Sequence, residues 1–289
     1  MNYVLHILVM MSIYFVLALS LNMVVGFTGL MSLAHAAFYG IGAYVSTLSL
    51  LKLGVGFFPA MLLGVVAAVI FSFTISIPSL RLRGDYFVLA SMGLQIIAFA
   101  ILYNWTGVTR GPYGITGIPR PVVFGFQLTT IAQFLVLSAV IAGLCVWLLY
   151  LIGNSPFGRT LKAIREDEMA AAALGKDIPR FKITAFAISA GFAAVAGALY
   201  AGYMRYIDPT SFVLMESVFI LSIIVIGGTG NIIGPVIGTV LMILLPEFLR
   251  FVKMPDAVAA NMRQVIYGLL IILIMRFRPQ GIRGEYKFQ

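Results

Sequence analysis

Long runs of hydrophobic residues make up most of this chain, and charged residues separate one run from the next. A membrane-spanning helix needs roughly 20 mostly apolar residues. A charge near the bilayer centre costs about 2.5–3.5 kcal/mol on insertion scales, so each uncharged run is a candidate span. Residues 53–80, 86–109, 129–152 and 183–204 each fit one such helix.

Two longer runs need a break in the helix. Residues 1–51 are too long for one span, and the Gly26–Gly29 segment is the natural place for a turn because glycine accepts turn conformations. Residues 217–246 are interrupted by the Gly227–Asn231 segment and by Pro235, which predicts two short or discontinuous helices.

A last uncharged run, residues 264–275, is too short to cross alone and needs either the preceding Asp256–Arg263 stretch or a partner surface. The pattern as a whole predicts an all-α, polytopic membrane protein with discontinuous glycine-rich segments. We expect about nine transmembrane helices, within a range of roughly eight to ten. Residues 1–289 are expected to form a single transmembrane domain.

The Lys and Arg residues predict the orientation in the membrane, because cytoplasmic loops carry an excess of them. We place the 81–84 turn, the 153–182 loop and the C-terminal tail on one side. The opposite side then holds seven of the 19 basic residues. The other twelve lie on the first side: Arg81, Arg83, Arg159, Lys162, Arg165, Lys176, Arg180, Lys182, Arg276, Arg278, Arg283 and Lys287.

This distribution predicts that the N-terminus lies outside and the C-terminus in the cytoplasm. The N-terminal segment lacks the basic start and small-residue cleavage site of a signal peptide, so we expect the first helix to stay in the mature protein.

Composition narrows the functional class further. Hydrophobic residues make up 61% of the chain and charged residues 10%, and the mean hydropathy is +1.05. This much apolar surface cannot be hidden inside one soluble globule, which excludes a soluble enzyme, a disordered chain and a nucleic-acid binder. The net charge of +9 fits an excess of cytoplasmic Lys and Arg.

The chain offers little for bound cofactors. Cys145 is the one cysteine of the sequence and lies in an apolar run, which excludes a disulfide framework and a cysteine-based metal site. No Gly-x-x-x-x-Gly-Lys-Ser/Thr motif is present, so the chain cannot hold ATP by that loop. We expect neither a metal nor a cofactor in this chain.

Two stretches carry backbone-breaking residues inside the predicted spans, Asn22–Gly42 and Gly227–Gly238. Irregular backbone at membrane depth is tolerated only against protein or a water-filled path, and interrupted helices in both halves of a chain point to a translocation path. Close helix packing is the alternative, because glycine lets helices approach. The candidate path residues are Asn22, Thr28, Ser32, His35, Gly228 and Asn231.

His35 allows two roles, a proton acceptor or a hydrogen bond that holds the break together. Glu216 and Glu247 begin and end the broken run, and we expect both near a membrane interface, where long side chains reach water cheaply. No series of Asp, Glu and His runs through the spans, which argues against a proton pump or proton-coupled carrier.

Small residues recur at helical spacing in two places. Ser189, Ala193, Gly197 and Ala201 stand at every fourth position of the 183–204 span. Gly234 and Gly238 repeat the spacing after the second break. Both patterns predict smooth faces against neighbouring helices.

The 153–182 loop is the long polar segment of the predicted cytoplasmic side. Ser155-Pro156 is typical of a helix start and Gly175 of a helix end. We expect one short, alanine-rich, charged helix between them. It is either a solvated interfacial helix or a docking surface for a cytoplasmic partner.

The loop sequence resembles that of a known family. Gly158–Gly175 looks like the loop of permeases in branched-chain amino acid ABC transporters of the LivM type, and segments 81–87, 109–119 and 227–235 resemble recurring segments of the same family. The resemblance covers most of the chain. The general importer loop has Glu-Ala-Ala, three residues and then Gly. Ala170, Ala171 and Gly175 match it, whereas Met169 stands in place of Glu and Glu168 lies one position earlier.

This resemblance implies a permease subunit of a bacterial inner-membrane importer that moves branched-chain amino acids inward by alternating access. The implied partners are a second, LivH-like permease, two ATP-binding subunits that hold ATP and Mg, a solute-binding protein and membrane lipid, without nucleic acid. The chain itself is then a transport subunit and not an enzyme. The implied ATPase-coupling residues are Arg165, Glu166, Asp167, Glu168, Ala170, Ala171 and Gly175.

Three other functions remain open at this point. The nearest is a urea or short-chain amide permease of the same family. The second is a stand-alone ion-coupled carrier. The third is a structural membrane subunit of a respiratory complex, against which the missing acidic relay counts.

Overall fold

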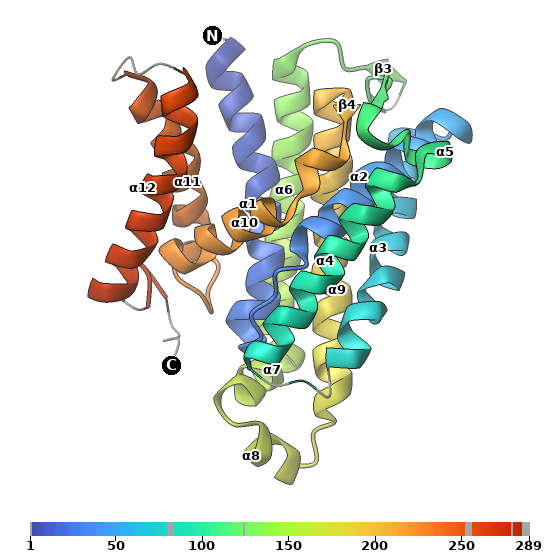
Figure 1. The fold of residues 1–289 in the computed structure, drawn as a ribbon. Helices are drawn as coiled ribbons and strands as arrows, with labels where there is room; N and C mark the ends of the chain where they lie inside the picture. The colour runs from blue at the N-terminus through green and yellow to red at the C-terminus, as the bar shows by residue number, and fades with distance from the viewer. Residues whose placement is uncertain are drawn as a thin grey trace.

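The computed structural model describes residues 2–79, 82, 84–123, 125–251, 256–278 and 280–284. Within these residues the chain forms twelve α-helices, two 3-10 helices and four strands of two residues each, so the all-α prediction is confirmed (Figure 1). Four of the basic residues used to predict the orientation lie outside the described residues: Arg81, Arg83, Lys253 and Lys287.

The α-helices are α1 Asn2–Thr28, α2 His35–Lys52, α3 Phe57–Ser79, α4 Asp85–Asn104, α5 Thr106–Thr109, α6 Ile131–Asn154, α7 Pro156–Glu166, α8 Glu168–Ala173, α9 Ile178–Met204, α10 Leu214–Gly227, α11 Ile233–Phe251 and α12 Asp256–Phe277. The 3-10 helices are η1 Gly111–Tyr113 and η2 Pro209–Phe212. Two antiparallel pairs join β1 Ile115–Thr116 to β4 Tyr206–Ile207 and β2 Val122–Val123 to β3 Phe126–Gln127.

Helices α1, α3, α4, α6 and α9 are, among the described residues, the five that are long and apolar enough to cross a membrane. The other expected spans correspond to α2, α10, α11 and α12. In α10, α11 and α12 the described apolar stretches are Leu214–Gly227, Ile233–Glu247 and Val265–Ile274. The expected number of nine crossings is therefore not confirmed. α10 has 14 residues, fewer than the roughly 20 that one crossing requires.

The breaks predicted at Gly26–Gly29 and Gly227–Asn231 are confirmed, whereas Pro235 lies in the first turn of α11 and does not interrupt it. α1 ends at Thr28, where Gly29 takes a φ of +74° and its N–H donates to the carbonyl of Val25. This left-handed glycine is the usual way to end a helix. α10 ends at Gly227 and α11 begins at Ile233. The last helix begins at Asp256, as the shortness of its uncharged run required.

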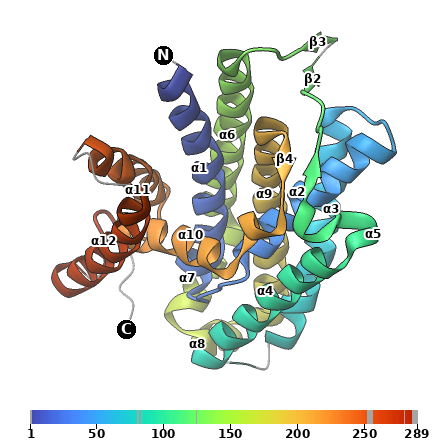
Figure 2. The same cartoon turned by 45° about the horizontal axis from the view of Figure 1, so that its top comes forward.

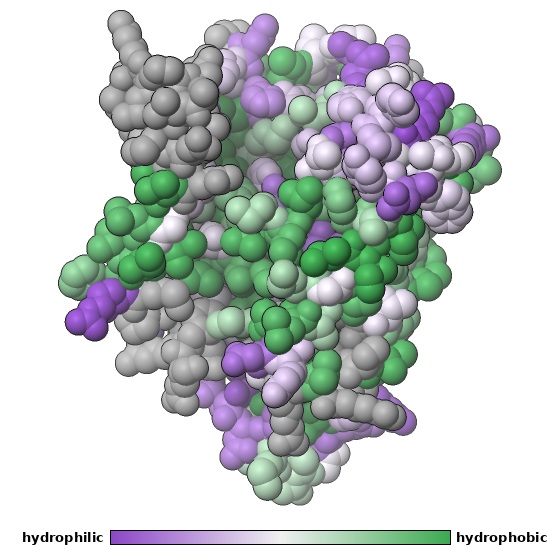
Figure 3. Space-filling view, in the orientation of Figure 1, coloured by the Kyte–Doolittle hydropathy of each residue, from purple (hydrophilic) through white to green (hydrophobic). Residues whose placement is uncertain are grey.

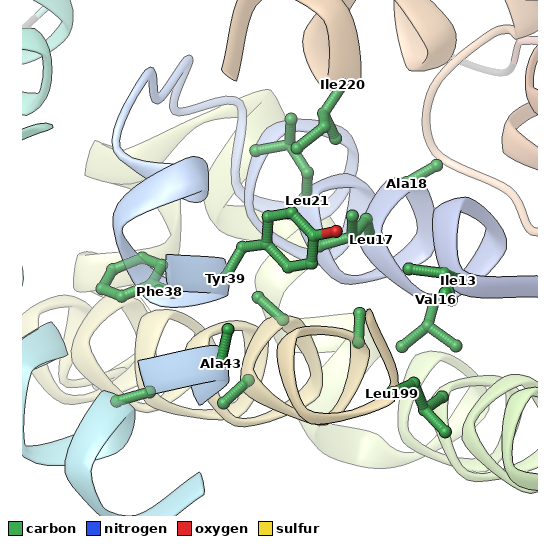
Figure 4. Close-up of a cluster of buried hydrophobic side chains, with 14 of the residues drawn as sticks. Ile13, Val16, Leu17, Ala18, Leu21, Phe38, Tyr39, Ala43, Leu199 and Ile220 are labelled. Atoms are coloured by element: carbon green, nitrogen blue, oxygen red, sulfur yellow. The ribbon is translucent and has the colours of Figure 1, made fainter. Parts of the chain in front are cut away.

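α1 and α9 occupy the centre of the bundle. Of the most apolar 18 residues, 56% are buried in α1 and 61% in α9, against 28% in α3, α4 and α6. Figure 4 shows the core between the helices, with Leu17 and Leu21 of α1, Tyr39 of α2, Leu199 of α9 and Ile220 of α10. The outward faces of α3, α4 and α6 carry exposed Leu, Ile and Val side chains suited to lipid.

Glycine and alanine permit the close crossing of α2 and α9. A Cβ atom on Gly197 would lie 2.2 Å from the carbonyl oxygen of Tyr39, and one on Gly42 would lie 2.3 Å from Cα of Ala194. The face formed by Ser189, Ala193, Gly197 and Ala201 is buried, which confirms its predicted packing role. Gly234 and Gly238 likewise abut α10, since a Cβ on Gly238 would lie 2.0 Å from the carbonyl oxygen of Ile223.

The bundle has two ends of different character (Figures 1 and 2). The N-terminus, α5 and all four strands lie at one end, here called the strand end. α7 and α8 lie at the opposite end, here called the α8 end, together with the end of α3 and the start of α4. Figure 3 shows hydrophilic residues gathered towards both ends and a hydrophobic band between them. This distribution is typical of a protein that spans a bilayer.

Candidate coupling and translocation site

The 153–182 loop folds as two short helices, not one. Ser155 begins α7, because its Oγ accepts a hydrogen bond from the N–H of Gly158 at 3.3 Å. Asp167 then leaves the helix with a φ of −155°, and its Oδ1 accepts from the N–H groups of Met169 at 2.8 Å and Ala170 at 3.0 Å. The expectation of one helix is therefore wrong, because the Asp167 side chain caps a new helix. Gly175 has a φ of +75° just beyond α8, which confirms it as the stop.

The tip of α8 presents apolar side chains to solvent. Met169 is 81% exposed and Leu174 is 79% exposed. Ala170 is exposed as well, whereas Ala171 is buried. Large exposed apolar side chains in a charged loop mark a candidate surface for interaction. Sequence reasoning missed Met169 and Leu174, although two large apolar residues flanking a run of alanines in a charged loop were a usable signal.

Charged side chains tie α7 and α8 to the central helices. The guanidinium of Arg165 donates through Nη1 to the carbonyl oxygen of Gly26 at 2.6 Å, and through Nη2 to Glu166 Oε1 at 2.5 Å. Its side chain is only 7% exposed, whereas that of Glu166 is 64% exposed. Glu168 forms an ion pair with Lys182 of α9. Three predicted coupling residues therefore have distinct positions: Arg165 and Glu168 face the bundle and Glu166 faces solvent.

A second contact joins α7 to the same end of α1. The ammonium of Lys162 lies 5.1 Å from the centroid of the Phe27 ring. A cation at this distance from a ring is attracted by its electron-rich face. The last turn of α1 is thus held by two basic residues of α7.

The break between α10 and α11 is held from α1 by one amide side chain. Asn22 is buried; its Oδ1 accepts from the N–H of Gly230 at 3.1 Å, and its Nδ2 donates to the carbonyl of Asn231 at 2.8 Å. Asn231 Oδ1 accepts from the N–H of Gly234 at 2.7 Å and so caps α11. A Cβ on Gly26 would lie 2.6 Å from the nitrogen of Gly230. The structure therefore places two predicted path residues, Asn22 and Asn231, in one contact.

The C-terminal segment completes this contact. The N–H groups of Ile282 and Arg283 donate to the carbonyls of Ile226 and Gly227, each at 3.0 Å. Gly228, a third predicted path residue, has a φ of +105° and a backbone so close to this segment that a Cβ would lie 2.3 Å from the nitrogen of Gly284. Carbonyl groups at the end of α10 thus find donors outside their own helix. We call the last two turns of α1, residues 228–231 and residues 280–284 the junction.

The first break, residues 29–34, is held by serine side chains of other helices. The N–H of Leu33 donates to Ser91 Oγ of α4 at 3.0 Å, and the N–H of Ala36 donates to Ser217 Oγ of α10 at 2.9 Å. Backbone donors that leave a helix at membrane depth need such partners. Sequence reasoning did not single out Ser91 or Ser217, because a lone serine in an apolar helix carries no distinctive signal.

The remaining predicted path residues are buried around this break. Thr28 Oγ1 donates to the carbonyl of Val24 at 2.7 Å, and Ser32 Oγ accepts from the N–H of Ala34 at 3.3 Å. His35 Nε2 and Ser20 Oγ lie 2.7 Å apart in a hydrogen bond, which is the structural role considered for His35. That these residues line a path stays a prediction. No cluster of three or more His, Cys, Asp or Glu side chains suited to a metal occurs in the described part of the chain.

Two tyrosine–glutamate hydrogen bonds connect α1 to the C-terminal half. Tyr3 donates to Glu247 at the strand end, where an interface position was expected for that glutamate. Tyr14 donates to Glu216 Oε1 at 2.6 Å. Since Tyr14 lies near the middle of α1, the interface position expected for Glu216 is wrong. The break before α10 places the start of this helix inside the bundle.

Comparison with known proteins assigns the fold to a family. The family model described as "Branched-chain amino acid transport system / permease component" matches residues 3–275. The chain belongs to this family. The high-affinity branched-chain amino acid transport system permease protein LivM of Escherichia coli (strain K12) is 35% identical to this permease over 93% of the chain and 67% of its own length.

More distant relatives extend along most of the permease. The probable branched-chain amino acid transport permease protein LivM of Methanocaldococcus jannaschii is 25% identical over 96% of the chain and 92% of its own length. The LivH permease protein of Escherichia coli (strain K12) is 27% identical over 95% of the chain and 92% of its own length. No solved structure matches this permease.

The junction of this permease yields a first prediction. Asn22→Ala removes both side-chain partners of residues 230 and 231 and leaves buried backbone groups unpaired, at a cost of about 1–3 kcal/mol each. Amide hydrogens of the 228–234 peptide should therefore exchange faster by roughly one to two orders of magnitude, as measured by mass spectrometry in detergent. Asn104→Ala is the control, because Asn104 is exposed and its side chain, among the described residues, bonds only to Ala100 of its own helix. Equal exchange in both variants would contradict the role of Asn22.

Proposed function

We propose that this permease moves branched-chain amino acids into the cytoplasm as one of two permease subunits of an ATP-binding cassette importer. The observation that carries the proposal is the 35% identity to LivM of Escherichia coli over nearly the whole chain. The related LivH protein supports a second, LivH-like permease as partner. Two ATP-binding subunits that hold ATP and Mg and a solute-binding protein complete the proposed complex in the bacterial inner membrane.

We assign the α8 end to the cytoplasm. The loop that forms α7 and α8 carries Arg159, Lys162, Arg165 and Lys176, and loops rich in Lys and Arg face the cytoplasm. The N-terminus then lies outside. In this orientation the strand end, with residues 105–127 and the 206–212 turn, faces the solute-binding protein.

The apolar tip of α8 is the proposed docking point for an ATP-binding subunit. Met169 and Leu174 project from it into solvent, and Glu166 adds an exposed charge beside them. Burial of apolar side chains supplies most of the free energy of a stable protein interface. Displacement of α8 and α7 by the closing ATPase then reaches α1 through Arg165 and Lys162, both of which contact its last turn.

The junction converts this displacement into a change of the transport path. Movement of the α1 terminus carries Asn22, and through Asn22 the break between α10 and α11. We propose that the two broken regions, with Asn22, Thr28, Ser32, His35, Gly228 and Asn231, flank the path and shift as rigid units between outward and inward openings. The outward and inward states must differ in their contacts with the ATPase, because a partner shifts an equilibrium only when it binds one state more tightly than the other.

The proposed transport activity is tested with the complete complex in proteoliposomes. We expect uptake of labelled leucine that requires ATP and the binding protein and that isoleucine and valine inhibit while urea does not. Inhibition of uptake by urea would favour the amide permease. Leucine uptake by the permease alone, driven by a proton or sodium gradient, would favour an ion-coupled carrier and contradict the proposal.

The 153–182 loop gives a separate prediction. Gly175→Pro should abolish leucine uptake, because proline cannot take the φ of +75° and removes the N–H that donates to the carbonyl of Ala172. Membrane insertion should be unchanged, since the loop lies outside the spans. Gly175→Asn is the matched control, because asparagine tolerates left-handed backbone and should retain most of the uptake. Normal uptake with proline at position 175 would refute the role of this loop.

A further inference from the structure

Glu216 is an acidic side chain held deep within the bundle. Its partner Tyr14 lies about 18 Å along α1 from the first residue, at 1.5 Å per residue. Glu216 lies in the first turn of α10, and this turn starts inside the bundle. The other acidic residues with described side chains also lie in loops or near helix ends: Asp85, Glu166, Asp167, Glu168, Asp177, Asp208 and Glu247. An ionisable residue at such a depth is expensive to insert and marks a functional position.

The surroundings of Glu216 leave its carboxylate poorly satisfied. An ionised carboxylate can accept about four hydrogen bonds. In the part of the chain that the structure describes, Glu216 receives one bond, from Tyr14, and no ion pair. Both side chains are partly exposed. Figure 3 shows a recess in this face above α10, with α1 and α6 behind it. The second carboxylate oxygen, Oε2, has no hydrogen-bond partner among the described residues, so it can accept from a donor outside the chain.

A second polar group, the hydroxyl of Tyr39, points towards the contact between α1 and α10. The hydroxyl of Tyr39 is buried, with the residue 1% exposed, and has no hydrogen-bond partner. Figure 4 shows this hydroxyl directed towards α1 beside Leu17, with Ile220 of α10 close by. Leu17 lies one helical turn beyond Tyr14, and Ile220 lies one turn beyond Glu216. The unpaired hydroxyl and the underbonded carboxylate thus face one interface, between α1 and α10.

Aromatic rings surround both groups. The ring of Phe219 meets that of Tyr14 edge-on, with centroids 5.4 Å apart, and the ring of Tyr200 lies 5.5 Å from that of Tyr39. Aromatic faces attract cations and also accommodate apolar side chains. The rings that pack against Tyr14 and Tyr39 therefore suit a small molecule that carries a positive charge next to a hydrophobic group.

We propose that Glu216, Tyr14 and Tyr39 form a subsite that binds the ammonium group of an amino acid during its passage through the permease. The inference rests on the proposed function, because it takes the transported substrate to be an amino acid. The ammonium supplies three N–H donors, which match the carboxylate oxygen and the two phenol oxygens. A neutral amide such as urea lacks the positive charge, so the subsite selects against it.

The test uses the complete importer, with its partner permease, ATP-binding subunits and binding protein, in proteoliposomes. Glu216→Gln keeps the shape of the side chain and removes its charge. Leucine uptake should fall by about 10- to 100-fold, the range for a lost charge-assisted hydrogen bond of about 1.5–3 kcal/mol. ATP hydrolysis stimulated by the loaded binding protein should continue. Glu216→Asp should recover part of the uptake.

Glu247→Gln is the matched control, because Glu247 also accepts a hydrogen bond from a tyrosine of α1 but lies at the strand end. Tyr39→Phe removes only the unpaired hydroxyl and should lower leucine uptake without reducing the yield of assembled complex. If Glu216→Gln fails to fold, leucine uptake by Tyr39→Phe tests the subsite instead, and unchanged uptake by this variant refutes it.

The outcomes separate this inference from the proposed function. If the unaltered complex takes up no leucine, the proposed function itself fails. If it takes up leucine and Glu216→Gln behaves as Glu247→Gln does, the subsite is refuted. Loss of the partner permease from the Glu216→Gln complex would make Glu216 an interface residue and would equally refute the subsite.

Discussion

Hydrocarbon gives a peptide group no hydrogen bond, so backbone that leaves a helix inside a bilayer must find its partners in the protein. This permease meets the demand at the last two turns of α1. The amide of Asn22 bonds the backbone of Gly230 and Asn231 across 208 and 209 positions of sequence. The C-terminal residues Ile282 and Arg283 bond the carbonyls at the end of α10. Without these contacts the break between α10 and α11 would leave unpaired polar groups buried inside the protein.

The same turns of α1 contact the loop that forms α7 and α8. Arg165 donates to the carbonyl of Gly26, one helical turn beyond Asn22, and Lys162 lies against Phe27. Helices α7 and α8 are therefore linked through a single helix end to the break between α10 and α11, which is the link that the proposed coupling to an ATPase requires. Rigid helices with polar contacts at their ends transmit displacement well, because packed interfaces shift between discrete arrangements instead of deforming continuously.

Much of the fold could be predicted because hydrophobic runs and glycines are local signals. The break after Gly227 and the start of the last helix at Asp256 follow from run length and composition alone. The depth of Glu216 could not be predicted, because it depends on where α10 begins relative to α1. The capping role of Asp167 was missed since its neighbours are equally charged. The hydrogen bonds from residues 282 and 283 to α10 could not be predicted either, because no sequence pattern links these two segments.

The central claim is that ATP-driven movement of α7 reaches the path through Arg165 and Gly26, and the number of leucine molecules transported per ATP hydrolysed tests it most directly. In the assembled importer with Arg165→Gln, the account predicts that hydrolysis stimulated by the loaded binding protein continues while this ratio falls several-fold. A ratio equal to that of the unaltered complex, whatever the absolute rates, would contradict the account, because transport would then stay coupled without this contact.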